Sequence, residues 1–256
     1  MSGERAGRDI PPAGLPGRML PGGPKPHDAG ALIVPDWQAN RQFPRYLIRL
    51  PLLHKAIAPA SAKAGVGWTR DLSEGGACVE LAERLPPQSV LHLILRTDRG
   101  SIELEGKVAW AGESSGAGGG VLHGLTFIRI AAEQLQALRD LIVTKGCVRS
   151  ADVRLPLRLP VTCRPKDGSG PPFAGSTGDI SRSGLLLLLP EVLPARSSLA
   201  ITLHTPNGRL DAEGEVVWVE PSEGRVAGRP VRHGFRFTSL GWSDSLSLGL
   251  FLAQAA

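Results

Sequence analysis

The chain repeats itself, and this repeat constrains its fold more than any other feature. The block DLSEGG from Asp71 returns as DISRSG from Asp179, 108 residues later, and LEGKVAWAGE returns as AEGEVVWVEP at the same offset. Two flanking blocks keep the order, because RYLIRLP and HGLTF return as RLPLRLP and HGFRF at offsets of 109 and 110 residues. Four blocks in one order predict two copies of one domain. A chain of 256 residues has room for two domains that each bury a core.

Each copy has the pattern of a β domain. Short segments that are apolar or alternate in hydrophobicity, such as VLHLIL and LAITLH, recur about every ten residues between turn residues. The 32 Gly and 22 Pro residues are too many for a helical bundle, while 42% hydrophobic residues are too many for general disorder. We therefore expect an all-β fold with helical appendages: two tandem six-stranded antiparallel β-barrels, each followed by a C-terminal helix.

The helix at the end of each copy is predicted from its own segment. Three apolar side chains of AAEQLQALRDLIVTKG share one helical face: Leu135, Leu138 and Ile142. Gly146 supplies the stop of this helix. The second helix is expected over residues 243–256, with Ser243 or Asp244 as its N-cap.

The domain boundaries follow from composition and from the repeat. Thirteen of the first thirty residues are Gly or Pro, so residues 1–35 are expected to form a disordered tail. The first domain should span residues 36–145 and the second residues 146–256. Only three residues lead from Gly146 to Arg149, which predicts that the two barrels are held close together.

Catalysis and metal binding have little support. The sequence holds no GxSxG, HExxH, P-loop lysine or GxGxxG, so no catalytic residue is assigned and the chain is not expected to be an enzyme. The three cysteines form no CxxC pair and offer no zinc spacing with the six histidines, so neither metal nor cofactor is expected. His123 and His233 occupy equivalent places before a glycine, and we interpret them as structural barrel residues.

The cellular location is predicted from the absence of long apolar segments in the sequence. Its longest apolar run covers residues 185–189, whereas a membrane span needs about twenty residues. The opening residues carry no apolar signal sequence. We therefore expect a cytoplasmic protein without a membrane span.

One constellation of polar residues remains. Arg41 and Arg45 have the spacing RxxxR ahead of the first strand, and DxSxxG follows with Asp71, Ser73 and Gly76. Taken separately, the two arginines could be solvated and DxSxxG could be a turn with a left-handed glycine. Together, in this order and ahead of GKVAW and HGLTF, they resemble the signature of the PilZ family of bacterial cyclic di-GMP receptors. The resemblance covers nearly all of residues 38–145, and a degenerate form covers 146–256.

The ligand that this resemblance implies suits these residue types. Cyclic di-GMP carries two phosphates and two guanines, and the planar fork of arginine can grip a phosphate, pair with a guanine edge or stack on a base. Asp71 can accept hydrogen bonds from a guanine N1–H and N2–H₂ edge, Ser73 can bond a base or phosphate oxygen, and Gly76 allows close approach of the backbone. Asn40 stands where an extra arginine accompanies a ligand pair in the family, so one ligand is expected in this domain.

The second copy departs from the signature at one point. Its DxSxxG residues are intact: Asp179, Ser181 and Gly184. Arg154 corresponds to Arg45, but Ser150 takes the place of Arg41, and Arg149 is the nearest substitute. The second site therefore either binds the ligand through Arg149 and Arg154, or the second barrel serves as a docking module.

The resemblance implies a receptor that signals to an unidentified protein partner when ligand orders residues 36–44. One alternative is a tandem PilZ-like scaffold that binds only protein. Another is a small-barrel binder of single-stranded nucleic acid, which is disfavoured because aromatic residues make up only 5% of the chain. The net charge of +5 is also below that of a general duplex binder. Self-association is left open.

Overall fold

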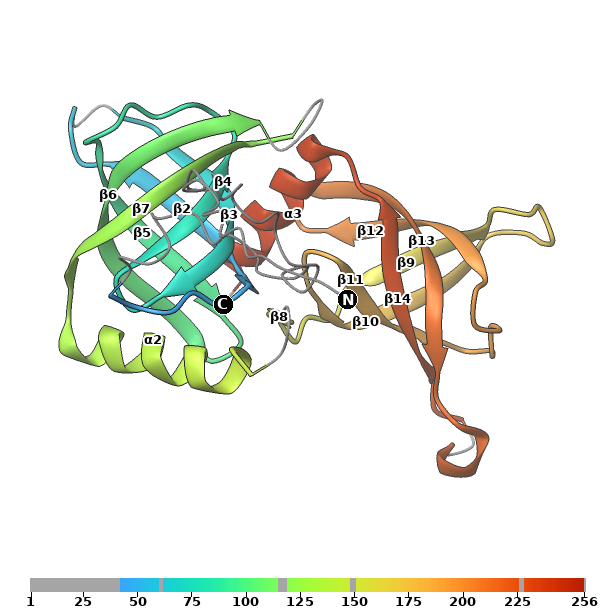
Figure 1. The fold of residues 1–256 in the computed structure, drawn as a ribbon. Helices are drawn as coiled ribbons and strands as arrows, with labels where there is room; N and C mark the ends of the chain where they lie inside the picture. The colour runs from blue at the N-terminus through green and yellow to red at the C-terminus, as the bar shows by residue number, and fades with distance from the viewer. Residues whose placement is uncertain (1–41, 60–61, 115–118, 148–150, 226–227, 256) are drawn as a thin grey trace, which may run out of the picture. The chain divides into compact units, whose positions relative to one another are not determined.

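The computed structural model describes residues 42–59, 62–114, 119–147, 151–225 and 228–255 (Figure 1). Within these ranges the chain forms two closed barrels of six strands each, with antiparallel pairing throughout each barrel. A helix follows each barrel. The predicted fold class is therefore confirmed.

The first barrel closes in the order β2-β3-β4-β7-β6-β5. Its strands are β2 (Pro51–Ala56), β3 (Ala64–Ser73), β4 (Gly76–Leu81), β5 (Val90–Thr97), β6 (Gly100–Ser114) and β7 (Val121–Ile130). Side chains that alternate along these strands fill the interior, among them Leu52, Val79, Leu93, Val108 and Leu125, all of which are buried. This alternation is the pattern from which the sequence predicted strands.

The second barrel has the same topology, with the order β10-β11-β14-β13-β12-β9. Its strands are β9 (Pro160–Pro165), β10 (Phe173–Ile180), β11 (Gly184–Leu189), β12 (Ser198–Thr205), β13 (Gly208–Val219) and β14 (Val231–Ser239), and a short 3-10 helix, η1 (Ser222–Gly224), lies before β14. Its interior is again apolar and includes Val161, Leu187, Ile201, Val216 and Phe235. The apolar LLLLL run is therefore a core strand.

The first of the two helices, α2 (Ala132–Lys145), lies within the predicted segment. Its buried residues are Leu138, Leu141 and Ile142, whereas Leu135 is only half-buried. Gly146 is the C-cap as predicted, but its φ of −70° is helical, so it ends the helix without a left-handed conformation.

The second helix, α3 (Trp242–Gln254), begins earlier than predicted. The N-cap is Gly241, so the prediction of Ser243 or Asp244 as the cap was wrong. The extended backbone of Gly241 places its carbonyl to accept the first helical hydrogen bond, from the Ser245 N–H. Asp244 therefore lies inside the first turn, where its charge favours the helix dipole.

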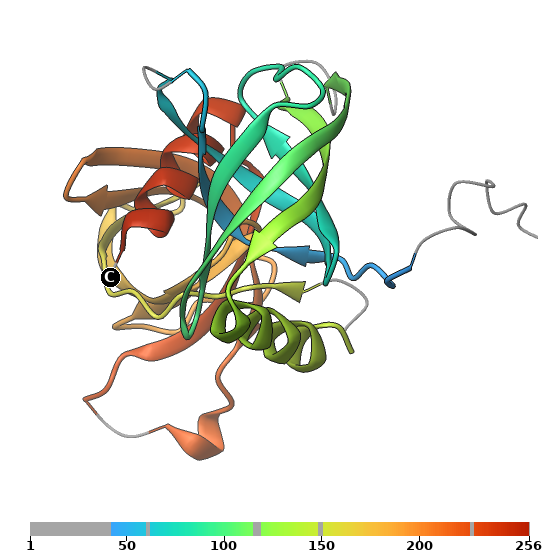
Figure 2. The same ribbon diagram turned by 90° about the vertical axis from the view of Figure 1, so that its left-hand side faces the viewer.

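The two barrels are in direct contact, as the short linker predicts. Strand β1 (Ile48–Arg49), just before the first barrel, pairs in parallel with β8 (Ala151–Asp152), just before the second. Helix α3 packs on β13 of its own barrel and also on β2, β3 and β5 of the first barrel. Figure 2 shows the red helix α3 next to the blue strands of the first barrel. The C-terminal helix thus belongs to the packing of both barrels.

Candidate functional site

Arg45 and Asp71 meet on the outside of the first barrel. An isolated bridge between Tyr46 and Leu72, with backbone hydrogen bonds of 2.8 and 2.9 Å, holds the segment before β1 against the end of β3. Their neighbours are thereby brought together, and Arg45 Nη1 donates to Asp71 Oδ1 over 2.7 Å. These two predicted site residues, 26 positions apart, form one ion pair.

Asp71 is also held by the backbone of the neighbouring strand. The Cys78 N–H on β4 donates to the same Oδ1 over 3.0 Å, so this oxygen has two donors. The second carboxylate oxygen has no hydrogen-bond partner within the described part of the chain. It can accept a hydrogen bond from a ligand without breaking a contact described here.

Ser73 and Gly76 close the turn between β3 and β4. The buried Ser73 hydroxyl donates to the Gly76 carbonyl over 3.0 Å, so in this structure it stabilises the turn. Gly76 does not have a left-handed backbone. A Cβ at this position would overlap the Leu125 carbonyl of β7, so glycine is required by close packing between strands. The interpretation of DxSxxG as a turn with a left-handed glycine is therefore wrong for Gly76.

Two further residues of the turn are anchored by elements around it. A Cβ on Gly75 would lie 2.7 Å from Cδ2 of Phe43, so the Phe43 ring lies against the turn. Glu74 accepts a hydrogen bond of 2.8 Å from Arg139 of helix α2. The turn is thus held between the segment that follows Arg41 and the helix. Arg41 itself and residues 1–40 lie outside the described residues, so the predicted tail and the position of Arg41 are not described.

The second barrel reproduces this arrangement. Arg154 Nη1 donates to Asp179 Oδ1 over 2.7 Å, and Ser181 Oγ donates to the Gly184 carbonyl over 3.0 Å. A Cβ on Gly184 would overlap the Phe235 carbonyl, as at Gly76. The Arg154 side chain is 46% exposed, against 21% for Arg45, so the second ion pair is more open to solvent. Arg149 lies outside the described residues.

The strand register places two side chains beside Asp71 that the sequence did not assign to the site, Cys78 and Trp110. Asp71 is opposite Cys78, Cys78 is opposite Gly124, and Gly124 is opposite Trp110, so these four residues form a row across β3, β4, β7 and β6. Gly124 has no side chain, and a Cβ there would overlap the Trp110 indole. Trp110, which is 45% exposed, therefore lies over bare backbone on the face that carries Asp71. The recurrence of this tryptophan as Trp218 was a signal, but its place beside Asp71 depends on register.

Cys78 does not supply a nucleophile to this face. Burial, followed by the neighbouring Asp71 carboxylate, raises the pKa of its thiol to about 11. The group is therefore a thiol at neutral pH, which is a poor nucleophile.

The two equivalent histidines are structural, as predicted. His123 Nδ1 donates to the Val121 carbonyl over 3.0 Å, and its Nε2 accepts from the Leu85 N–H over 2.9 Å. His233 repeats both contacts with Val231 and Leu193. Burial lowers the pKa of each imidazole, which keeps the neutral form that these contacts need.

The described residues provide neither a metal site nor a helix that could span a membrane. No group of three or more His, Cys, Asp and Glu side chains in that part of the chain is arranged to hold a metal ion. None of its helices combines the length and the apolar character of a membrane span.

Comparison with known proteins gives the following matches. The family model described as "PilZ domain" matches residues 39–144 and again residues 149–252. No curated protein matches the chain. Among solved structures, the inhibitor of motility MotI/DgrA of Bacillus subtilis is 11% identical, with 79% of this chain and 94% of that chain covered and a TM-score of 0.34.

Two structures whose titles name a ligand also match. The PilZ domain with c-di-GMP of YcgR from Escherichia coli is 16% identical over 41% of this chain and 90% of that chain, with a TM-score of 0.35. The MrkH–c-di-GMP complex of K. pneumonia is 14% identical over 79% of this chain and 86% of that chain, with a TM-score of 0.34. Because these identities and TM-scores are low, the assignment of the chain to a family rests on the family model.

Proposed function

The chain belongs to the PilZ domain family, with two tandem domains, and from this premise we propose that it is a cytoplasmic receptor for cyclic di-GMP. The observation that carries the proposal is the ion pair between Arg45 and Asp71 beside the turn of DxSxxG. It brings a guanidinium and a carboxylate to one place on the barrel surface. These are the two groups that can hold the phosphate and the guanine of one nucleotide.

In the proposed complex, each group has a separate partner. Arg41 and Arg45 hold the phosphates or a guanine face, because a planar guanidinium can make paired hydrogen bonds and can stack. Asp71 accepts hydrogen bonds from the N1–H and N2–H₂ edge of guanine. Ser73 and Gly76 keep the turn in the shape that allows the ligand to approach. When Asp71 turns to the guanine base, Arg45 loses its carboxylate partner, and the negative charges of the ligand phosphates then balance the charge of Arg45.

The second barrel is proposed as a weaker site. Asp179, Ser181 and Gly184 reproduce the first turn, and Arg154 reproduces Arg45. The greater exposure of Arg154 means that its bonds to a ligand compete more with water and are screened more by salt. Arg149 would have to supply the second guanidinium from a position one residue earlier in the chain than the RxxxR spacing gives, because Ser150 occupies that place.

The proposed output is a change in the segment before the first barrel. Ligand held by Arg41 and Arg45 would order residues 36–44, and a protein partner would recognise the ordered form. No catalytic step is part of this function. Hydrogen exchange that shows no added protection of residues 36–46 when ligand is present would exclude this output.

Calorimetric titration with cyclic di-GMP tests the receptor function. Wild-type protein should bind the ligand, and Arg45→Ala should lose about tenfold or more in affinity, because a hydrogen bond to a charged group is worth about 1.5–3 kcal/mol. Arg129→Ala is the matched control, since it removes the same charge from an exposed pair with Glu105 and should bind as wild type does. An absence of binding by the wild type would favour the protein-only scaffold. Equal affinity in Arg45→Ala would exclude the proposed site.

A further inference from the structure

Trp68 and Glu80 lie opposite each other on β3 and β4 of the first barrel. Their neighbours in the two strands face the barrel interior, so both side chains face outward. They are nevertheless only 1% and 2% exposed. Outward-facing residues can be buried to this degree only if another part of the chain covers them.

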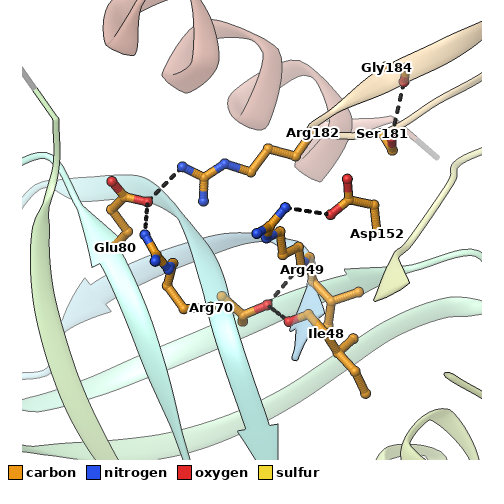
Figure 3. A network of polar contacts seen from close by, with 10 residues as sticks. Ile48, Arg49, Arg70, Glu80, Asp152, Ser181, Arg182 and Gly184 are labelled. Atoms are coloured by element: carbon orange, nitrogen blue, oxygen red, sulfur yellow. Dashed lines mark hydrogen bonds and ion pairs between the residues drawn. The ribbon is translucent and has the colours of Figure 1, made fainter. Parts of the chain in front are cut away.

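The cover includes Arg182 of the second barrel (Figure 3). Arg182 lies in the second DxSxxG turn, next to Ser181, and its Nη2 donates to Glu80 Oε2 over 2.6 Å. Its guanidinium carbon is 5.4 Å from the centre of the Trp68 ring, within the range of a cation–π contact. The turn of the second motif is thus attached to the first barrel.

The same carboxylate also faces the first motif. Arg70 Nη1 is 3.8 Å from Glu80 Oε2 (Figure 3). Arg70 immediately precedes Asp71 at a β-bulge in β3. The Arg70 side chain is 42% exposed, so a ligand in solvent can reach it. Glu80 therefore contacts one arginine beside each motif.

The link from Arg182 through Glu80 to Arg70 is not repeated between the two copies of the domain, because the equivalent positions carry other residues. In the first turn, Glu74 takes the place of Arg182 and pairs with Arg139 of α2. In the second barrel, Gly178 takes the place of Arg70 and Leu188 that of Glu80. The three charged residues therefore occur only where the two barrels meet, and only the first site has the additional arginine.

We propose that Arg182 is a positioning residue for the first ligand site, which it affects through Glu80 and Arg70. Because Arg182 makes the shorter contact with the buried Glu80 carboxylate, Arg70 is held there only at 3.8 Å and can turn to the anion bound beside Asp71. Without Arg182, Glu80 draws Arg70 toward itself and places a less compensated negative charge near a ligand with two negative charges. This inference rests on the proposed function, since it concerns affinity for the same ligand.

The experiment uses the full chain with Arg154→Ala added throughout, so that only the first site is titrated with cyclic di-GMP. Arg182→Ala should weaken binding by about three- to thirtyfold, the range typical of mutations that act through a coupled network. Adding Glu80→Gln to Arg182→Ala should restore the affinity, because the negative charge that Arg182 no longer offsets is gone and Arg70 is released. Arg182→Lys keeps the charge and should retain most of the affinity.

Lys166→Ala is the control, because it removes one positive charge from the second barrel at an exposed pair with Glu213. It should leave the affinity unchanged, and thermal melts should show that every variant is folded. Unchanged affinity in Arg182→Ala would overturn the proposal, as would a loss that Glu80→Gln does not restore. If the Arg154→Ala parent does not bind at all, the proposed first site itself fails, which is a different result.

Discussion

The indole Nε1 of Trp68 on β3 donates a hydrogen bond of 3.1 Å to the backbone carbonyl of Ser245 on α3, 177 residues further along the chain. The bond is buried, and it joins the first barrel to the helix that ends the second. Gly249, one turn further along α3, lies against the same indole. The last helix of the chain therefore contributes to the stability of the first barrel.

A larger side chain at position 249 should separate these two elements. A Cβ on Gly249 would lie 3.1 Å from Trp68 Nε1, which is closer than ordinary van der Waals contact, so a leucine side chain would have to displace the indole. Glycine is about 0.8–1 kcal/mol less favourable than alanine in a helix and leucine ranks close to alanine, yet we expect Gly249→Leu to lower the free energy of unfolding by about 1–3 kcal/mol. Chemical denaturation measures this difference. Ser247→Leu, on the exposed side of α3, is the control and should leave the free energy of unfolding unchanged. Gly249→Leu with wild-type stability would contradict the packing described here.

The glycine that ends DxSxxG should be intolerant of any side chain. At Gly76 a Cβ would overlap the backbone carbonyl of Leu125, which is fixed in the barrel. We expect Gly76→Ala to lower the free energy of unfolding by about 1–3 kcal/mol. Gly75→Ala is the neighbouring control, since its Cβ would meet only the Phe43 side chain, which can move. Thermal denaturation compares the two variants, and equal losses would show that close strand packing is not the reason for glycine at position 76.

Acid should destabilise the fold through His54. Burial, with a smaller effect of His123, lowers the pKa of His54 from 6.5 to about 4. As the pH falls below about 6.5, the unfolded chain takes up a proton that the folded chain does not, so stability is lost progressively down to about pH 4. For this shift the loss is about 3 kcal/mol in total. Denaturation at several pH values should show a shallower pH dependence in His54→Leu than in the wild type, and an unchanged slope would contradict this assignment.

Much of the fold could be predicted from local patterns. The alternation of apolar residues identified the strands, and the repeat showed that one topology occurs twice. The helix prediction was less accurate at the start of α3, because Gly241 can serve as an N-cap through its backbone, a role that carries no side-chain signal. The polar residues of the turn were also identified in advance, since Asp71, Ser73 and Gly76 form a motif within six residues.

The sequence by itself determined the duplicated barrel and the composition of the candidate site, because both depend on residue types at short, regular spacings. The tertiary structure decided which residues lie together across long spacings. Strand register placed Trp110 in the row that contains Asp71. Alternation along β3 and β4 shows that Trp68 and Glu80 face outward, but it carries no information on what covers them. That cover is Arg182 and helix α3, and its formation depends on the free energy of packing between segments more than a hundred residues apart.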